Sequence, residues 1–233
     1  GLDGFAGQPL VFTNDRGWNV ALSKAVIHVG ATYLDQNLPV SGAQNTSCIL
    51  PGLYIAQVTE GLDVDLLSPA PQRFPRAGHG TTGVALAGQV WLTGGAVDAL
   101  TDETTILTIE GTASFGADVR PFAGAVTISA NRKAESELAG ANPICKERIV
   151  SPIPTRVVVE RGGGLLLRID PRLLFVNVDF AQLVKGTESY GFSDEPSDID
   201  PASPSFYSQP SVNLYQNLHS GGALFTFTWE PSL

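Results

Sequence analysis

Phe225-Thr226-Phe227-Thr228-Trp229, near the end of the chain, is the stretch that decides the fold. Aromatic residues alternate with threonines, and Glu230-Pro231 ends the run. Successive side chains of a β-strand point to opposite faces, so this period of two indicates a strand with one buried face. Threonine and aromatic residues also favour strands. We therefore predict a half-buried strand here.

The same alternation recurs upstream, and we expect further strands at Thr104–Gly111, Phe122–Ser129, Arg156–Arg161 and Leu165–Asp170. Gly162-Gly163-Gly164 separates the last two, which predicts a hairpin with a glycine turn. Longer strands are expected at Val20–Tyr33 and Val84–Leu92. Gly30 and Gly88 interrupt them, and each is a possible bulge site.

Helical signals are sparse. Asp170 followed by Pro171 is a good start for a helical turn, and Pro171–Val184 should hold one short helix, either there or at Phe180–Lys185. Lys133–Gly140 is a second short candidate. The 233 residues include 25 Gly and 16 Pro and only 16% charged residues, which excludes a helical bundle. We predict one all-β domain over residues 1–233, an antiparallel β-sandwich with long loops and one or two short helices.

The charge excludes one class of partner. The chain has 14 basic and 23 acidic residues, a net charge of −9, and no basic face for nucleic acid. No apolar run approaches the roughly 20 residues that span a bilayer, so we expect no transmembrane segment. Gly186–Pro210 is predicted to be a long acidic loop rich in Pro and Ser. A loop of that length is either functional or disordered.

Cys48 and Cys145 are the only cysteines, and neither has the spacing of a zinc site. We predict one disulfide between them, which implies an oxidising compartment; the alternative is a pair of buried thiols in the cytosol. The chain contains no Met and begins at Gly1, as a processed product would. We therefore expect an exported protein, periplasmic, attached to the outer membrane or extracellular, with a lipid anchor possible in the precursor.

Metal binding is a hypothesis at two places. His28, His79 and His219 are the only histidines, and any two brought together by the fold would suit copper or zinc. Asp194, Asp198 and Asp200 lie in the acidic loop and are the calcium alternative, because calcium prefers oxygen ligands. A solvated histidine and a solvated acidic loop are the simpler interpretations of both.

Catalytic signatures are missing: the chain holds no Gly-x-Ser-x-Gly, no His-Glu-x-x-His, no Walker loop and no dinucleotide fingerprint. Asp170 and Asp179 would act as paired carboxylates only if they shared a cleft. Asp170 is more simply a helix cap and Asp179 a turn residue. A hydrolase is therefore the third of our functional hypotheses.

Three patches resemble bacterial exported β-sandwich lipoproteins, in particular the methanobactin-associated (MbnP-like) and copper-repressible surface protein families. They are Phe12–Ala25, Thr108–Ala113 with Pro121-Phe122, and Leu165–Phe175 with Val178-Asp179-Phe180, about a third of the chain. The resemblance implies a surface or periplasmic sandwich that binds copper through histidines and, in some members, an oxidised Trp. None of the three tryptophans here lies within three residues of a His.

These observations support two main hypotheses about function, which we rank. The first is a non-enzymatic exported binding protein whose ligand is a metal, copper before calcium. The alternative is a surface, adhesion or assembly subunit that acts through protein–protein contacts or self-association.

Overall fold

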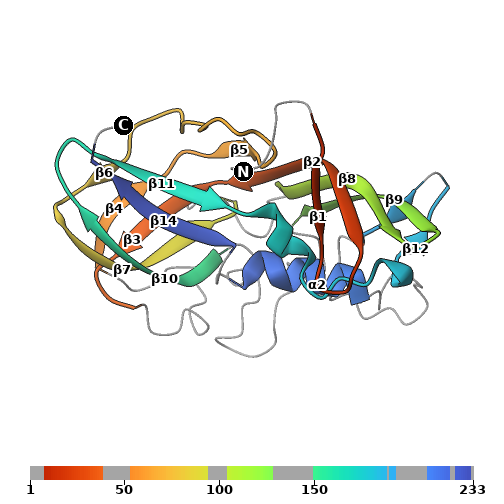
Figure 1. Cartoon of the computed structure of the whole chain (residues 1–233). Coiled ribbons are helices and arrows are strands. Elements are labelled where there is room, and N and C mark those ends of the chain that lie inside the picture. The colour runs from red at the N-terminus through yellow and green to blue at the C-terminus, as the bar shows by residue number, and fades with distance from the viewer. Residues whose placement is uncertain are drawn as a thin grey trace, which may run out of the picture.

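Strands dominate the structure, a computed structural model that describes residues 8–38, 53–93, 104–127, 149–187, 189–192, 209–220 and 224–231. They form sheets of seven, five and two strands (Figure 1). The seven-stranded sheet contains β1 (Leu10–Thr13), β2 (Asn19–Val29), β5 (Leu62–Asp65), β8 (Thr105–Phe115), β9 (Asp118–Thr127), β12 (Val184–Lys185) and β13 (Tyr190–Gly191). The five-stranded sheet contains β3 (Ala31–Asp35), β4 (Tyr54–Val58), β6 (His79–Gly80), β7 (Gly83–Trp91) and β10 (Ile149–Val159). The two-stranded ribbon is β11 (Gly164–Ile169) with β14 (Phe225–Glu230).

The seven-stranded sheet is organised around β2. Its order is β1-β2-β8-β9-β13-β12, and β5 pairs with β2 beyond the end of β1. The first half of β2 pairs with β1, Leu22 opposite Leu10, and the second half pairs with β5, Val26 opposite Asp65. Every pairing described in this sheet is antiparallel except the short one between β13 and β9. One long strand thus supports two short edge strands.

Gly30 is where the chain changes sheets. β2 ends at Val29 in the seven-stranded sheet, and β3 begins at Ala31 in the five-stranded sheet, whose order is β10-β7-β3-β4-β6. The Gly30 N–H donates to the carbonyl of Trp91 at 2.8 Å. The predicted strand Val20–Tyr33 is therefore two strands, and the interruption at Gly30 is a crossing between sheets instead of a bulge.

Gly88 marks a close approach between layers. A Cβ at this position would overlap the buried ring of Phe227 on β14, so only glycine fits. The irregular pairing lies on the neighbouring strand: β10 shifts register between Val150 and Ile153 and again between Pro154 and Val157. The bulge that the sequence predicts at Gly88 on β7 is thus found next to Gly88, on the paired strand β10.

The predicted glycine hairpin is wrong. The segment around Gly162 does connect two strands, but β10 pairs with β7 whereas β11 pairs with β14. Gly162 has a φ of +77°, which suits a sharp reversal. The reversal carries the chain from one layer to the other, because Leu165, Leu167 and Ile169 pack against the core from the ribbon side.

Two 3-10 turns and one α-helix complete the described fold. The turns are η2 (Pro171–Phe175), capped by Asp170, and η3 (Phe180–Gln182), capped by Asp179. Both predicted positions in Pro171–Val184 therefore hold a short helical turn. The helix α2 (Gln209–His219) is not among the predicted helices, and its first two residues fall in the predicted acidic loop Gly186–Pro210. The candidate helix Lys133–Gly140 lies outside the described residues.

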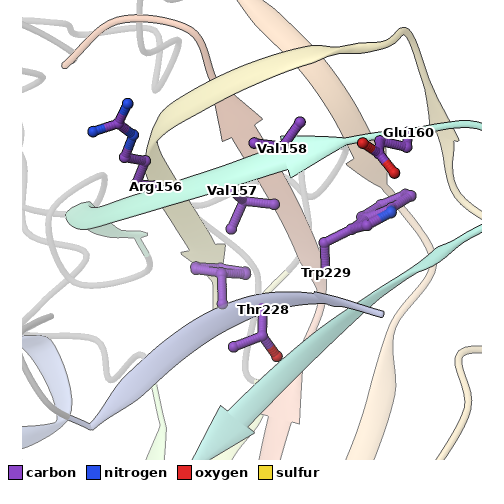
Figure 2. A pocket seen from close by; sticks show the side chains of 7 residues that line it. Arg156, Val157, Val158, Glu160, Thr228 and Trp229 are labelled. Carbon is purple, nitrogen blue, oxygen red and sulfur yellow. The ribbon is translucent and has the colours of Figure 1, made fainter. Parts of the chain in front are cut away.

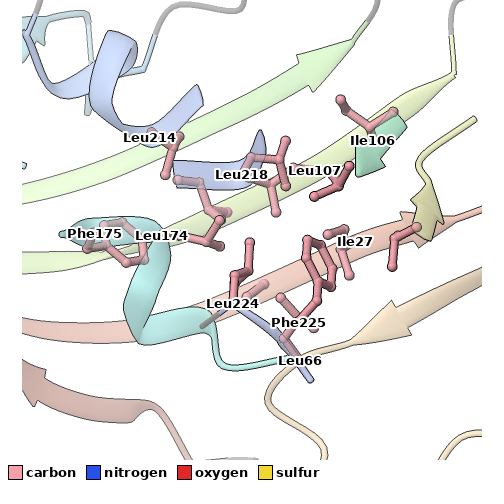
Figure 3. Packing of buried hydrophobic residues seen from close by; sticks show 14 of the residues in the cluster. Ile27, Leu66, Ile106, Leu107, Leu174, Phe175, Leu214, Leu218, Leu224 and Phe225 are labelled. Atoms are coloured by element: carbon pink, nitrogen blue, oxygen red, sulfur yellow. The ribbon is translucent and has the colours of Figure 1, made fainter. Parts of the chain in front are cut away.

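One continuous apolar core joins the three sheets. It includes side chains from the seven-stranded sheet, the five-stranded sheet and the ribbon, together with η2, η3 and α2. Figure 3 shows Leu174, Leu214 and Leu218 from the helical segments facing Ile27 and Leu107 on β2 and β8. The predicted all-β sandwich with short helices is confirmed. Trp91, Ala31 and Ile149 form a second, smaller cluster with Tyr33 packed against it.

Candidate functional site

The three histidines lie on three different elements. His28 is in the second half of β2, His79 is exposed on the short edge strand β6, and His219 is the last residue of α2. The His219 Nδ1–H donates to the Tyr215 carbonyl at 2.8 Å, and its ring packs on that tyrosine with centroids 4.3 Å apart. In the part of the chain that the structure describes, no three His, Cys, Asp or Glu side chains are grouped so that they could hold a metal ion.

His28 is the histidine with the most defined surroundings. It lies opposite Asp63 in the β2–β5 pairing, and its Nδ1–H donates to Asp63 Oδ1 at 2.6 Å. Gly61 lies so close that a Cβ there would come within 2.9 Å of ring atoms Cε1 and Nε2. Because Nδ1 is engaged by the carboxylate, Nε2 is the ring nitrogen left for a further contact, as in metal sites where a carboxylate orients the ligating histidine.

Several predicted residues cannot be placed. Cys48 and Cys145, the predicted disulfide, lie outside the described residues. So do Asp194, Asp198 and Asp200, the predicted calcium ligands. Of the predicted loop Gly186–Pro210, the described parts include strand β13 and the first two residues of α2.

Asp170 and Asp179 act as helix caps. Asp170 accepts the Arg172 backbone N–H and a bidentate ion pair from the same arginine. Burial tends to raise the pKa of Asp170, but these bonds outweigh it and hold the pKa below its usual range. Asp179 accepts from Gln182, from the Ala181 backbone and from the Trp18 indole, and its pKa is likewise lowered although burial opposes this. Both carboxylates therefore stabilise the turns they begin.

An open groove lies where β10 and β14 run beside each other (Figure 2). Its volume is about 400 Å³, and its lining residues are Arg156, Val157, Val158, Glu160, Phe227, Thr228 and Trp229. In Figure 2 the side chains of Val157 and Trp229 extend into the space between the two strands, whereas Val158 points away from it. We call this the open-side groove, since it is bounded by one edge strand of each layer.

The open-side groove has an apolar floor and a charged rim. Val157 and Phe227 are buried, while Arg156, Val158 and Glu160 are exposed. Among the described strands, β10 pairs only with β7 and β14 only with β11, so each leaves one edge unpaired beside the groove.

Trp229 forms one wall of the groove, and its indole packs on Gly163, where a Cβ would overlap it. The Trp229 indole N–H is buried and has no hydrogen-bond partner in the described part of the structure. A buried donor without an acceptor is unfavourable, and this N–H lies on the Gly163 side of the indole. The sequence indicates Trp229 as a core residue. Nothing in the sequence reveals that the unpaired edge of β10 lies beside β14, the strand that carries Trp229.

A buried hydrogen-bonded chain occupies the middle of the five-stranded sheet. The Trp91 indole donates to Gln89 Oε1 at 3.0 Å, and Gln89 Nε2 donates to Asp35 Oδ2 at 2.7 Å. Asp35 is fully buried, and its Oδ1 has no partner among the described residues. The rings of Tyr54, Tyr33 and Trp91 form a row beside it, with centroids 5.0 and 5.3 Å apart.

Burial raises the pKa of Asp35 to about 6, although the bond from Gln89 acts in the opposite direction. Sequence reasoning missed this group. The available signal was Gln89, an amide inside the otherwise apolar run Val84–Leu92, because a buried amide needs partners.

No helix in the described part of the chain is both long enough and apolar enough to cross a membrane. Comparison with known proteins finds no matching protein family, no matching curated protein and no matching solved structure.

Proposed function

We propose that this chain is a non-enzymatic binding protein, exported to the cell surface or periplasm, that works as an assembly subunit through protein–protein contacts at its open-side groove. The observation that carries the proposal is the coincidence of an apolar groove, two unpaired strand edges among the described strands and an exposed apolar side chain at one place. Val158, on the face of β10 that points away from the groove, is 49% exposed. Protein interfaces combine a buried aromatic or apolar centre with a polar rim, and this groove has both.

The edges define the mode of binding. An unpaired strand edge presents backbone N–H and C=O groups that a second extended chain can bind, so the natural occupant is a β-strand. Val157, Phe227 and Trp229 would receive every second side chain of that strand, because successive side chains alternate between faces. Arg156 and Glu160 at the rim would restrict which charges are accepted.

Selection from a phage-displayed library of random peptides tests this function. Wild-type protein should enrich peptides that alternate apolar and polar residues, and Val158→Lys should abolish that enrichment, since a lysine on an edge strand opposes pairing. Val119→Lys is the matched control: Val119 is 57% exposed on β9 in the other sheet, and its replacement should leave the enrichment intact. The proposal fails if wild type enriches no such peptides, or if both variants behave alike.

Copper binding is a second candidate, and the pair His28–Asp63 is the observation that favours it. The pair leaves the imidazole Nε2 for a further ligand, and imidazole nitrogen suits copper. Titration with Cu²⁺ followed by electron paramagnetic resonance should then give a bound signal near one equivalent. His28→Ala should remove the signal, and His79→Ala, on the exposed strand β6, should retain it. Absence of a bound signal in wild type rejects this candidate.

A further inference from the structure

The two halves of β10 differ as edge strands. The first half contains Pro152 and Pro154, which lack an N–H, and both register shifts begin there. Proline and irregular pairing are the features that protect an edge from unwanted pairing. After the second shift, which spans Thr155 and Arg156, regular pairing resumes at Val157–Val159, and Glu160 follows the end of β10. This stretch contains no proline and three β-branched residues in succession, so it is better suited than the first half to accept another strand.

Two opposite charges, Arg156 and Glu160, lie at equal distances from Val158 at the centre of this segment. Arg156, Val158 and Glu160 are exposed, and Val157 and Val159 between them are buried. If two such strands run antiparallel with Val158 opposite Val158, each Arg156 lies opposite Glu160 of the second copy. Opposite charges directly across a sheet stabilise the pairing, and like charges destabilise it. Parallel pairing in register would instead place Arg156 opposite Arg156.

From this self-complementarity we propose that the partner at the open-side groove is a second copy of this chain, paired antiparallel through the last residues of β10, with Arg156 and Glu160 on either side of Val157–Val159. This inference rests on the proposed function and names its partner. The pairing is isologous, so one two-fold axis passes beside Val158 and the assembly closes at a dimer. It would join the five-stranded sheets of the two copies into one continuous sheet and cover Val158 in both.

The dimer also covers the mouth of the groove. Val157 and Trp229 line the groove on the inner side of β10, so a strand added to the β10 edge lies across its opening. The same contact that pairs the charges therefore removes the groove from solvent.

Charge exchange followed by sedimentation velocity tests the pairing. Wild type should form dimers over a concentration series and lose them in high salt. Arg156→Glu should weaken the dimer at least tenfold, and Glu160→Arg should do the same, because each places like charges opposite one another twice. An equimolar mixture of the two variants should recover a dimer, and so should the double variant that carries both substitutions.

Hydrogen exchange on wild type provides a readout that needs no substitution. Amides of residues 155–160 should lose protection on dilution, while those of β2 should not. Wild type that stays monomeric at all concentrations overturns the self-pairing, as does a dimer that neither charge variant weakens. Peptide selection is independent of both results: if the wild-type monomer still enriches peptides and Val158→Lys does not, the proposed function stands and the partner is another protein.

Discussion

Replacing Asp35 by Asn should change how the stability of the protein depends on pH. The carboxyl group is fully buried at the end of β3, and one of its oxygens accepts a hydrogen bond from Gln89. Burial raises its pKa from the usual 3.8 to about 6. Between these two values the folded chain keeps a proton on Asp35 that the unfolded chain has already released.

The size of the effect follows from that difference. Each tenfold change in a protonation constant corresponds to about 1.4 kcal/mol, so a rise from 3.8 to about 6 amounts to roughly 3 kcal/mol. The sign is destabilising towards neutral pH. Well below the unfolded-state pKa of 3.8 both states are protonated and Asp35 has no effect; the free energy of unfolding then falls as pH rises to about 6 and is level above it.

Urea unfolding followed by tryptophan fluorescence at a series of pH values measures this. The amide introduced by Asp35→Asn can accept the same bond from Gln89 but does not titrate. The stability of Asp35→Asn minus that of wild type should therefore rise by roughly 3 kcal/mol from about pH 3 to about pH 7. Asp170→Asn is the contrasting variant. The pKa of Asp170 is lowered, so its stabilisation is lost as pH falls and the corresponding difference should have the opposite slope. A difference for Asp35→Asn that does not vary with pH would refute the reasoning.

Three further predictions concern stability and compartment. Gly88→Ala should lower the free energy of unfolding by about 2 kcal/mol, because the new methyl group overlaps the buried ring of Phe227; Gly191→Ala, with nothing within 4 Å, should leave the urea midpoint almost unchanged. Asn14→Leu should cost about 3 kcal/mol in the same assay, since it leaves without partners two backbone carbonyls and two N–H groups that the buried amide now binds, and Asn14→Asp should also be costly, because its carboxylate would face the two carbonyl oxygens in a buried site. For the predicted bond Cys48–Cys145, a thiol assay on unfolded, unreduced protein should detect no free thiol, and finding two would contradict both the disulfide and the oxidising compartment.

A period of two in the sequence predicts a strand reliably wherever that strand has one solvent-exposed face and one buried face. The ladder Phe225–Trp229 is β14, and the alternating segment Thr104–Gly111 lies in β8 almost residue for residue. Caps are equally readable, because Asp170 before Pro171 is a local signal that needs no partner from elsewhere. These features are encoded within a few residues.

What the sequence does not reveal depends on contacts far along the chain. The helix α2 has weak amphipathy because Asn213 and Asn217 point at the backbone carbonyls of the η2 region instead of at solvent. Leu214 and Leu218, four residues apart and buried, are the one helical signal available. The false hairpin has the same origin: the glycines after β10 indicate a reversal but not which sheet receives the next strand. The open-side groove needs β10 and β14 side by side, and no local pattern predicts that.

Asn14 has a consequence for the order in which the molecule is made. Its side chain binds the carbonyls of Phe175 and Val178, which are 161 and 164 residues further along. The hairpin of β1 and β2, which carries Asn14, pairs locally and can form as soon as both strands have been synthesised. Its attachment to Phe175 and Val178 must wait until a much later part of the chain exists, and folding dominated by such distant contacts is slow. The hairpin can thus form early, whereas its fixation on the η2 region comes late.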